Sequence, residues 1–165
     1  MFSLLQNDGL NIENICTMHR MLTKDIDAAE SGNYRKINVI IAGTSHDLPA
    51  YQDVPELMDK FESWIVENKH KFHPVIYAIL LHKELVFIHP FSDGNGRISR
   101  LAMNTILLQN GYLPIIVPPI LRLEYSRALD ATTKNDTQFI KFMLQQEIES
   151  QKAFLREMTS IKSHP

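Results

Sequence analysis

The residues with the clearest chemical potential lie between positions 89 and 100, where the sequence reads HPFSDGNGRISR. Gly94 and Gly96 allow backbone angles and close approaches that a Cβ atom would prevent, so neighbouring amides can converge on an anion. The stretch that follows, Ile98 to Asn110, has the apolar spacing of a helix. The positive end of that helix would point at the same place, which favours a phosphate site.

Four side chains of this stretch would complete such a site. Arg97 and Arg100, three positions apart, present two guanidinium groups that suit phosphate oxygens. Asp93 offers a carboxylate where phosphates would converge, which is a usual way to hold Mg²⁺ with few protein oxygens. His89 has an ordinary pKa near neutrality, so it can serve as a general base.

A plain turn is the alternative interpretation of the same residues. Asp-Gly and Asn-Gly are strong hairpin dipeptides, so SDGNGR could be a turn with solvated arginines. A hairpin would require alternating apolar residues after the turn, whereas ISRLAMNTILL has helical spacing. The sequence contains no GxxxxGK[ST] and no GxGxxG after a strand, which excludes the P-loop and Rossmann types of phosphate site.

Helical periodicity dominates the rest of the chain. Six helices are predicted: from Ile12 to about Ala29, from Pro55, from Pro74 to about His89, from Ile98 to Asn110, from about Leu121, and from Thr137. The one from Pro74 is apolar nearly all round, which is typical of a buried central helix. The β-branched segment INVIIA at 37–42 predicts the one strand, leading into an exposed loop or hairpin. The pattern indicates a mainly α domain with one small β element.

Length and charge narrow the class of protein. The 165 residues predict a single domain over 1–165 that can bury its own core. A net charge of -2 argues against nucleic acid or an anionic membrane as a partner. The N-terminus lacks the features of a secretory signal, and no apolar run approaches the roughly 20 residues of a membrane span. We therefore expect a soluble cytoplasmic protein, which the single cysteine, Cys16, also suits.

HPFSDGNGRISR matches, without a departure, the signature HxFx[DE]GNGRxxR, so the chain resembles the Fic family, whose members transfer AMP from ATP to protein hydroxyl groups. The resemblance extends to AAESGNYRKINVIIAG, which looks like the Gly-x-[Tyr/Phe]-Arg segment of the family, and to LVFIHPF. It covers roughly Ile12 to Phe154. It implies a mainly α, Fic-type helical domain with a small β-hairpin flap near the active site, at about Ser45 to Val54.

The resemblance also implies roles for the motif residues. His89 would be the catalytic base that deprotonates a Ser, Thr or Tyr hydroxyl, and Asp93 would hold Mg²⁺. ATP would be the co-substrate. Gly94, Asn95 and Gly96 would form the anion hole of the nucleotide site, and Asn95 would also donate from its side chain. Arg97 and Arg100 would bind the β and γ phosphates.

Three further positions carry expectations. Phe91 would be buried beneath the loop. Tyr125 resembles the family's aromatic beside the adenine, with a core aromatic as the alternative. Asn104 on the fourth predicted helix would satisfy a backbone group. The flap would bind a target protein by strand addition, which recognises backbone more than side chains.

The resemblance leaves other activities open. Doc-like relatives, which phosphorylate, carry Lys at the position of Gly96, so Gly96 favours AMP transfer. Transfer of UMP or phosphocholine, removal of AMP from a modified protein, and a nucleotide-binding interaction module without turnover are the alternatives. A homodimer is left open.

Many Fic proteins are restrained by a glutamate in the pattern [ST]xxxE[GN], which pairs with the second motif arginine, here Arg100. Ser63 to Asn68 fits the pattern but falls inside the second predicted helix, and we interpret the match as coincidence. We expect the inhibitory element either in a separate protein or upstream of Met1 in a longer parent.

Overall fold

The computed structural model describes residues 9–40 and 47–162, which are mainly helical. The α-helices are α2 (Ile12–Thr23), α3 (Val54–Asn68), α4 (Pro74–Ile88), α5 (Asn95–Gln109), α6 (Arg122–Asp130) and α7 (Thr137–Lys162). Short 3-10 turns are η1 (Tyr51–Asp53), η2 (Pro119–Leu121) and η3 (Ala131–Thr133). The mainly α class predicted from the sequence is confirmed.

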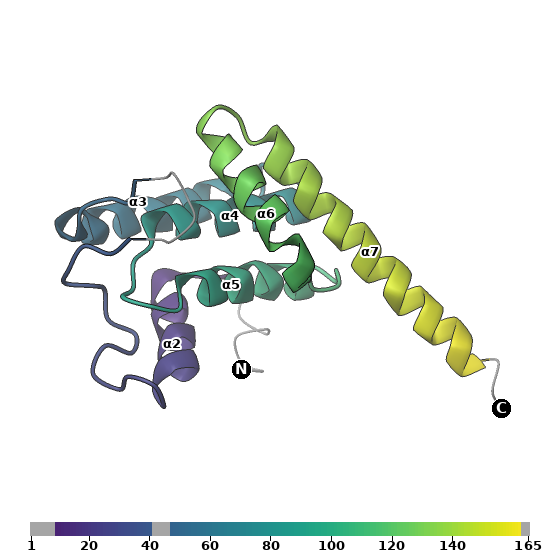
Figure 1. Ribbon diagram of the computed structural model, residues 1–165, viewed down its shortest axis with the longest axis horizontal. Helices are drawn as coiled ribbons and strands as arrows, with labels where there is room; N and C mark the ends of the chain where they lie inside the picture. Colours follow the sequence, from purple (N-terminus) through teal and green to yellow (C-terminus); the bar gives the residue numbers. More distant parts are fainter. Residues whose placement is uncertain (1–8, 41–46, 163–165) are drawn as a thin grey trace.

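Helix α4 is the centre of the core, as its uniformly apolar sequence predicts. Ten of its residues are buried, and it packs most extensively along α5, with α3 and α7 also in contact (Figure 1). Pro74 occupies the first turn, where its missing N–H costs no hydrogen bond. The helix ends at His89, which adopts a left-handed conformation. The core therefore holds the end of α4, and with it His89, in a fixed place.

Helix α2 ends earlier than predicted. The sequence pattern continues to about Ala29, but α2 stops at Thr23, and Ile26 of the predicted apolar stripe is 70% exposed. Thr23 donates through Oγ1 to the His19 carbonyl and shares a hydrogen bond with Ser31, which draws the chain into turns. Asp27 accepts two backbone N–H groups of the following turn, as turn-forming aspartates do.

Helix α5 begins three residues earlier than predicted, because Gly94 takes the N-cap position with a φ of 78° and Asn95 starts the first turn. The motif glycines and arginines therefore lie in the cap and first turns of α5. Among its apolar residues, Ile106 and Leu107 are buried and Leu101 is half-buried, whereas Leu108 is 46% exposed.

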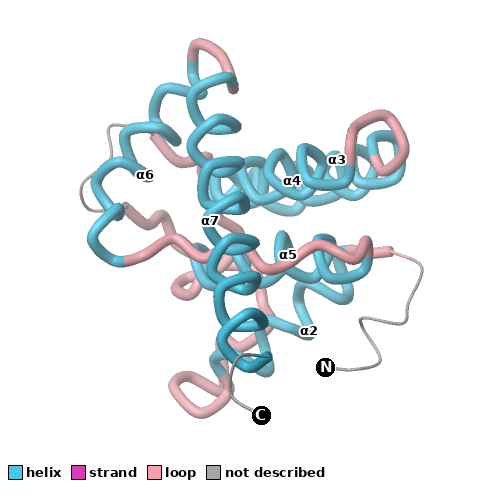
Figure 2. The backbone as a smooth tube through the Cα atoms, turned by 90° about the vertical axis from the view of Figure 1, so that its right-hand side faces the viewer, coloured by secondary structure: helices cyan, strands magenta, loops and turns pink. Residues whose placement is uncertain are grey.

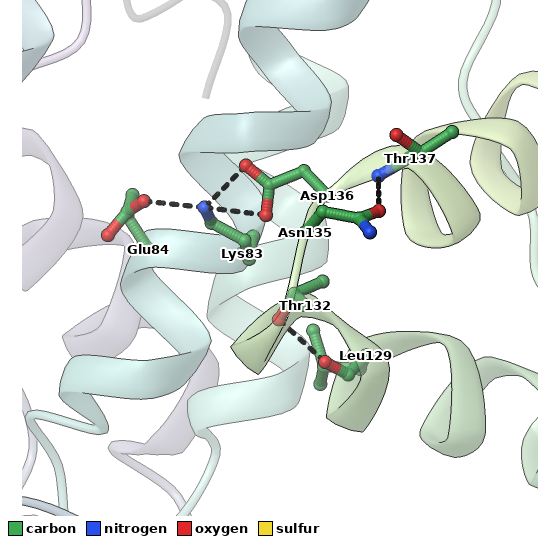
Figure 3. Close-up of polar contacts among 7 residues, drawn as sticks. All are labelled: Lys83, Glu84, Leu129, Thr132, Asn135, Asp136 and Thr137. Atoms are coloured by element: carbon green, nitrogen blue, oxygen red, sulfur yellow. Dashed lines mark hydrogen bonds and ion pairs between the residues drawn. The ribbon is translucent and has the colours of Figure 1, made fainter.

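Helices α6 and α7 close the chain, as predicted. Figure 2 shows α7 beside α6 and passing α4, and both contacts are present. The first half of α7 buries Phe139 and Met143, whereas residues 151–160 are exposed and project beyond the rest of the molecule (Figure 1). Lys83 on α4 is held by both carboxylate oxygens of Asp136, just before α7, and by Glu84 (Figure 3).

The predicted strand and flap are not seen as strands in the described residues. Positions 37–40 and 47–50 have no regular secondary structure, and η1 and the start of α3 follow. Ser45 and the C-terminal end of the predicted strand lie outside the described residues. No helix in the described ranges is long and apolar enough to cross a membrane.

Candidate active site

His89 terminates α4 in a conformation that non-glycine residues seldom adopt, with a φ of 51°. Its Nδ1 lies 3.2 Å from the Val86 carbonyl, and because a carbonyl can only accept, Nδ1 carries the proton. Nε2 then has a lone pair in the neutral ring, as a general base requires. Burial lowers the pKa of His89, aided by the charge of Arg35 and opposed by the Val86 hydrogen bond and Asp93, so the ring is neutral at pH 7.

Arg35 secures the backbone of His89. The Arg35 side chain donates from Nε to the His89 carbonyl at 2.8 Å, and its backbone N–H donates to Pro90 at 2.8 Å. Its two remaining nitrogens donate to the carbonyls of Ile37 and Pro49. Arg35 is only 2% exposed, and it joins the end of α4 to both sides of the 37–49 segment.

The side chain of Asn95 closes the loop between α4 and α5. Its Oδ1 accepts from the Phe91 N–H at 2.9 Å, and its Nδ2 donates to the Phe91 carbonyl at 2.7 Å. The carbonyl oxygen and one N–H of this carboxamide are thus bonded to the backbone of Phe91, and the second N–H of Nδ2 is the donor that the expected contact with the anion would use. The backbone N–H of Asn95 belongs to the first turn of α5, where amides have no partner within the helix.

Phe91 is fully buried beneath the loop, as expected, and its ring stacks on His19 of α2 with centroids 3.7 Å apart. His19 itself is 3% exposed and lies 3.0 Å through Nε2 from the Asp93 carbonyl. The loop that carries the motif thus rests on α2.

The two motif glycines differ in what they require. Gly94 needs its left-handed φ, and a Cβ there would lie 3.2 Å from His19 Nε2. Gly96 is helical, and a Cβ there would meet only Arg100, at 3.4 Å from Nη1. The backbone therefore demands glycine at 94, while at 96 the absence of a side chain leaves space beside the Arg100 guanidinium.

The charged side chains gather at the start of α5. Arg97 donates from Nη2 to Asp93 Oδ2 at 2.8 Å, and the Asp93 side chain is 81% exposed. Arg100 lies one turn further along α5 and is half-buried. The structure thus brings together His89, Asp93 and the arginines within one loop and one helix start, as the sequence predicted for their positions.

Tyr125 of α6 lies among aromatic rings. Its hydroxyl is 2.8 Å from His82 Nε2, and its ring packs against Phe139 and Phe142. Burial raises the pKa of Tyr125 to about 12, with Arg100 opposing. His82 is a hydrogen-bonded histidine of the core, and burial lowers its pKa to about 4. The tyrosine therefore has a core role at its hydroxyl, and the residue as a whole is partly buried against the core.

Two other expectations concern single residues. Asn104 accepts from the Ile115 N–H and donates to the Ile115 carbonyl, which confirms that it satisfies backbone groups. Glu67, of the apparent inhibitory pattern, is exposed on α3 and lies 4.0 Å from Lys71. Its ion pair is thus with a neighbour in sequence, in keeping with a chance match.

His19 was missed by the sequence reasoning, and Arg35 was noted only as part of a family segment. A signal for His19 existed, since it falls four residues after Ile15 and beside Met18, on the apolar face of α2. A polar side chain on a buried face needs a partner. Nothing in the periodicity indicated that the partner would be the motif loop, 74 residues away.

Comparison with known proteins places this arrangement in a family. Residues 9–107 match the model of the Fic/DOC family, which is more than half of the chain. This chain belongs to the Fic/DOC family. The resemblance of the motif at 89–100 is thereby confirmed, and the loop between α4 and α5 carries the Fic motif together with the first turns of α5.

Relatives named for an activity are similar over the same region. Protein adenylyltransferase Fic of Drosophila melanogaster is 41% identical over 143 residues, covering 86% of this chain and 29% of the relative. The Fic chain therefore spans less than a third of the curated relatives it matches.

Solved structures share the fold. Fic-1 of C. elegans superimposes with a TM-score of 0.76 at 29% identity, covering 97% of this chain and 46% of the other. A variant of IbpAFic2 in complex with adenylylated Cdc42 has a TM-score of 0.69 at 21% identity, covering 89% and 51%, and supports the fold alone.

Proposed function

We propose that this Fic protein transfers AMP from ATP to a hydroxyl group of a target protein and releases pyrophosphate. The observation that carries the proposal is the order of groups at one place. A neutral histidine with Nδ1 protonated closes α4, and the glycine cap and two arginines of α5 follow within eleven residues. The relatives named protein adenylyltransferase, at about 40% identity, support the same chemistry.

In the proposed step, His89 Nε2 accepts the proton of a Ser, Thr or Tyr hydroxyl as its oxygen forms a bond to the α-phosphorus. The bond from that phosphorus to the β-phosphate bridging oxygen breaks, and pyrophosphate leaves. Backbone amides of the α5 start would bind the charge on the α-phosphate, with Gly94, Asn95 and Gly96 as the candidates. Arg97 and Arg100 would hold the β and γ phosphates.

Asp93 fits the role of a Mg²⁺ ligand. Its carboxylate is exposed at the start of α5, and one carboxylate suffices where phosphates and water supply the other oxygens. Mg²⁺, when bound, would offset negative charge on the phosphates. When nucleotide and metal bind, the Asp93 carboxylate would hold Mg²⁺ in place of Arg97. Arg97 would hold phosphate in place of Asp93, so each side chain would keep a partner of opposite charge.

The segment 45–54 would serve as the flap that aligns the target, by pairing with an extended stretch of its backbone. Two contacts support this assignment. Arg35 joins the Pro49 and His89 carbonyls, and the Tyr51 N–H donates to Asn38 Oδ1 at 2.9 Å. Pro49 of the segment is thus joined through Arg35 to the backbone of His89, and Tyr51 is joined to Asn38. The Cdc42 complex of IbpAFic2 provides a precedent for a protein target within the fold.

Tyr125 would contact the adenine through the part of its ring that the core leaves uncovered, while its hydroxyl stays on His82. In this assignment the tyrosine sets the position of the base without taking part in the chemistry.

The test uses ATP labelled at the α-phosphate with a cell lysate. The wild-type chain should label protein at least about 100-fold faster than His89→Ala, because a general base contributes that much or more. His70→Ala, at an exposed histidine after α3, is the matched control and should keep the full rate. A mass increment of one adenylyl group on the labelled protein would identify the transferred group.

Equal labelling by wild type and His89→Ala would refute the proposal. ATP binding by calorimetry without labelling would instead indicate a nucleotide-binding interaction module. Label from UTP in place of ATP would indicate UMP transfer, and release of AMP from a modified protein would indicate the reverse activity.

A further inference from the structure

His19 of α2 holds two distant segments together through its ring nitrogens. The Gly32 N–H donates to Nδ1 at 3.0 Å, so Nδ1 is the acceptor and Nε2 carries the proton. Nε2 lies 3.0 Å from the Asp93 carbonyl oxygen and therefore donates to it. With 3% exposure, His19 has little access to water that could replace either partner.

The ring of His19 also packs against the motif loop, through one ring face and near the ring edge at Nε2. It stacks on Phe91 with the two planes only 4° apart. A Cβ at Gly94 would lie 3.2 Å from Nε2, so the loop backbone passes close to the imidazole. His19 thus contacts the motif loop at Phe91, Asp93 and Gly94.

The bond to the Asp93 carbonyl has a consequence for the next amide. That carbonyl and the Gly94 N–H belong to one planar peptide unit, in which the C=O and N–H point in opposite directions. Fixing the oxygen toward His19 therefore fixes the N–H away from it. The same bond limits rotation about the backbone of Asp93, whose side chain lies beside Arg97.

We propose that His19 is a positioning residue of the active site, which aims the Gly94 N–H and the Asp93 carboxylate by holding the peptide between them. This rests on the proposed function, in which that N–H binds the α-phosphate and that carboxylate holds Mg²⁺. His19 touches neither substrate nor metal and acts through the loop.

Two substitutions of His19 test the hydrogen bonds of its two ring nitrogens separately. His19→Gln can present an N–H near the position of Nε2 and keep the bond to Asp93. His19→Asn can present an oxygen near the position of Nδ1 and keep the bond to Gly32, but it is too short to reach Asp93. Both lose the stacking on Phe91, so a difference between them reports the bond to Asp93.

The first measurement is the rate of AMP transfer at saturating ATP and Mg²⁺. His19→Asn should be slower by about 10- to 100-fold, because small misplacements of catalytic groups cost up to that factor. His19→Gln should recover most of the rate. Ser31→Ala is the control for general destabilisation, since Ser31 is 4% exposed and loses bonds to Thr23 and Asp27 without touching the motif.

The second measurement is independent of turnover. Calorimetry with ADP, in EDTA and in Mg²⁺, gives the affinity gained from the metal. ADP affinity in EDTA should stay within about threefold for His19→Gln and fall further for His19→Asn, whose Gly94 N–H is less well aimed at the α-phosphate while Arg97 and Arg100 are unchanged in both. The gain from Mg²⁺ should persist in wild type and His19→Gln and fall at least about threefold in His19→Asn, whose Asp93 is less well placed.

Equal rates and equal Mg²⁺ gains for Asn and Gln would overturn the proposal, as would a loss in His19→Asn no larger than that in Ser31→Ala. A wild-type chain that gains nothing from Mg²⁺ would overturn it too. If the wild type labels no protein yet binds ADP more tightly with Mg²⁺, the proposed function fails while the calorimetric comparison still decides the role of His19.

Discussion

At the level of single residues, the surroundings of His89 favour the neutral form that the proposed general base requires. Burial and the charge of Arg35 act against protonation, so the pKa of His89 is lowered from 6.5. The base form is therefore present at neutral pH and is lost only as the pH falls through that lowered value.

We expect the initial labelling rate, measured at saturating nucleotide and Mg²⁺, to be flat from pH 8 to 7 and to decline below about 6.5. An acid limb with an apparent pKa above 7 would contradict the neutral-base assignment. Adenylyl transfer by His70→Ala should follow the wild-type profile, because that side chain lies outside the motif.

Gly94 and Gly111 form a matched pair for testing the loop. Both have a φ of 78°, but a Cβ at Gly94 would crowd His19, while one at Gly111 would meet nothing within 4 Å. Gly111→Ala should lower the free energy of unfolding by about 1 kcal/mol, the cost of the left-handed backbone. Gly94→Ala should cost about 1 kcal/mol more. Urea denaturation measures both, and equal losses would show that the loop yields to the extra methyl group.

The chemistry of the motif could be predicted from residue types, but the direction of its side chains could not. Acidic, basic and glycine residues at 93–100 indicate a phosphate site wherever they stand at the start of a helix. That Asn95 turns back onto Phe91, and that His19 reaches the Asp93 carbonyl, depends on which loop and which helix become neighbours. Such contacts are set by tertiary packing, which periodicity does not describe.

At the level of elements, patterns that reflect burial were predicted well, and those that depend on turns were not. The apolar sequence of α4 requires a buried helix, and Pro74 marks its first turn. The stripe of α2 continues past Thr23, yet the helix stops there, because Thr23, Ser31 and Asp27 stabilise turns instead. Polar side chains that hydrogen-bond to the nearby backbone stabilise turns in competition with the helix. The spacing of apolar residues carries no information about that stabilisation.

The ion pair of Lys83 and Asp136 joins α4 to the start of α7 (Figure 3). The Lys83 side chain is 13% exposed. Burial alone would lower its pKa, but the carboxylates of Glu84 and Asp136 outweigh burial, so the pKa of Lys83 is raised. Lys83→Met would keep the aliphatic stem and leave Asp136 without its partner. We expect a loss of about 1–3 kcal/mol in the free energy of unfolding at low salt.

Lys60→Met is the control for that measurement. Its pair with Glu56 is exposed on α3, so its removal should cost less than about 0.5 kcal/mol. Urea denaturation of both variants at low and high salt gives the comparison. Equal losses would show that the contact in Figure 3 contributes no more than a surface pair.

At the level of the whole molecule, the net charge of -2 conceals a local concentration of positive charge. Arg97 and Arg100 stand at the positive end of α5, whose macrodipole adds to their attraction for anions. The core of α4 and α5 places His89 at the C-terminal end of one helix and these arginines at the N-terminal start of the next. A compact polyphosphate fits such an arrangement better than an extended polyanion.

The long helix α7 has two halves with different roles in stability. Phe139, Met143 and Glu147 are buried, whereas every residue from 151 to 160 is exposed. A chain ending after Gln151 keeps the hydrogen bond from Gln151 to Glu147. Its free energy of unfolding should be within about 0.5 kcal/mol of that of the full chain. Its labelling rate should also be unchanged, since the motif lies on α4 and α5.

A chain ending after Phe142 is the matched control, because it also removes buried Met143, Gln146 and Glu147. Losing a buried methionine alone costs about 2–5 kcal/mol, so this chain should be strongly destabilised or unfolded. Urea denaturation and far-ultraviolet circular dichroism compare the two. If the chain ending after Gln151 loses as much stability as the shorter one, the exposed half of α7 must be covered in solution, and its exposed Phe154, Leu155 and Met158 would be the surface that is covered.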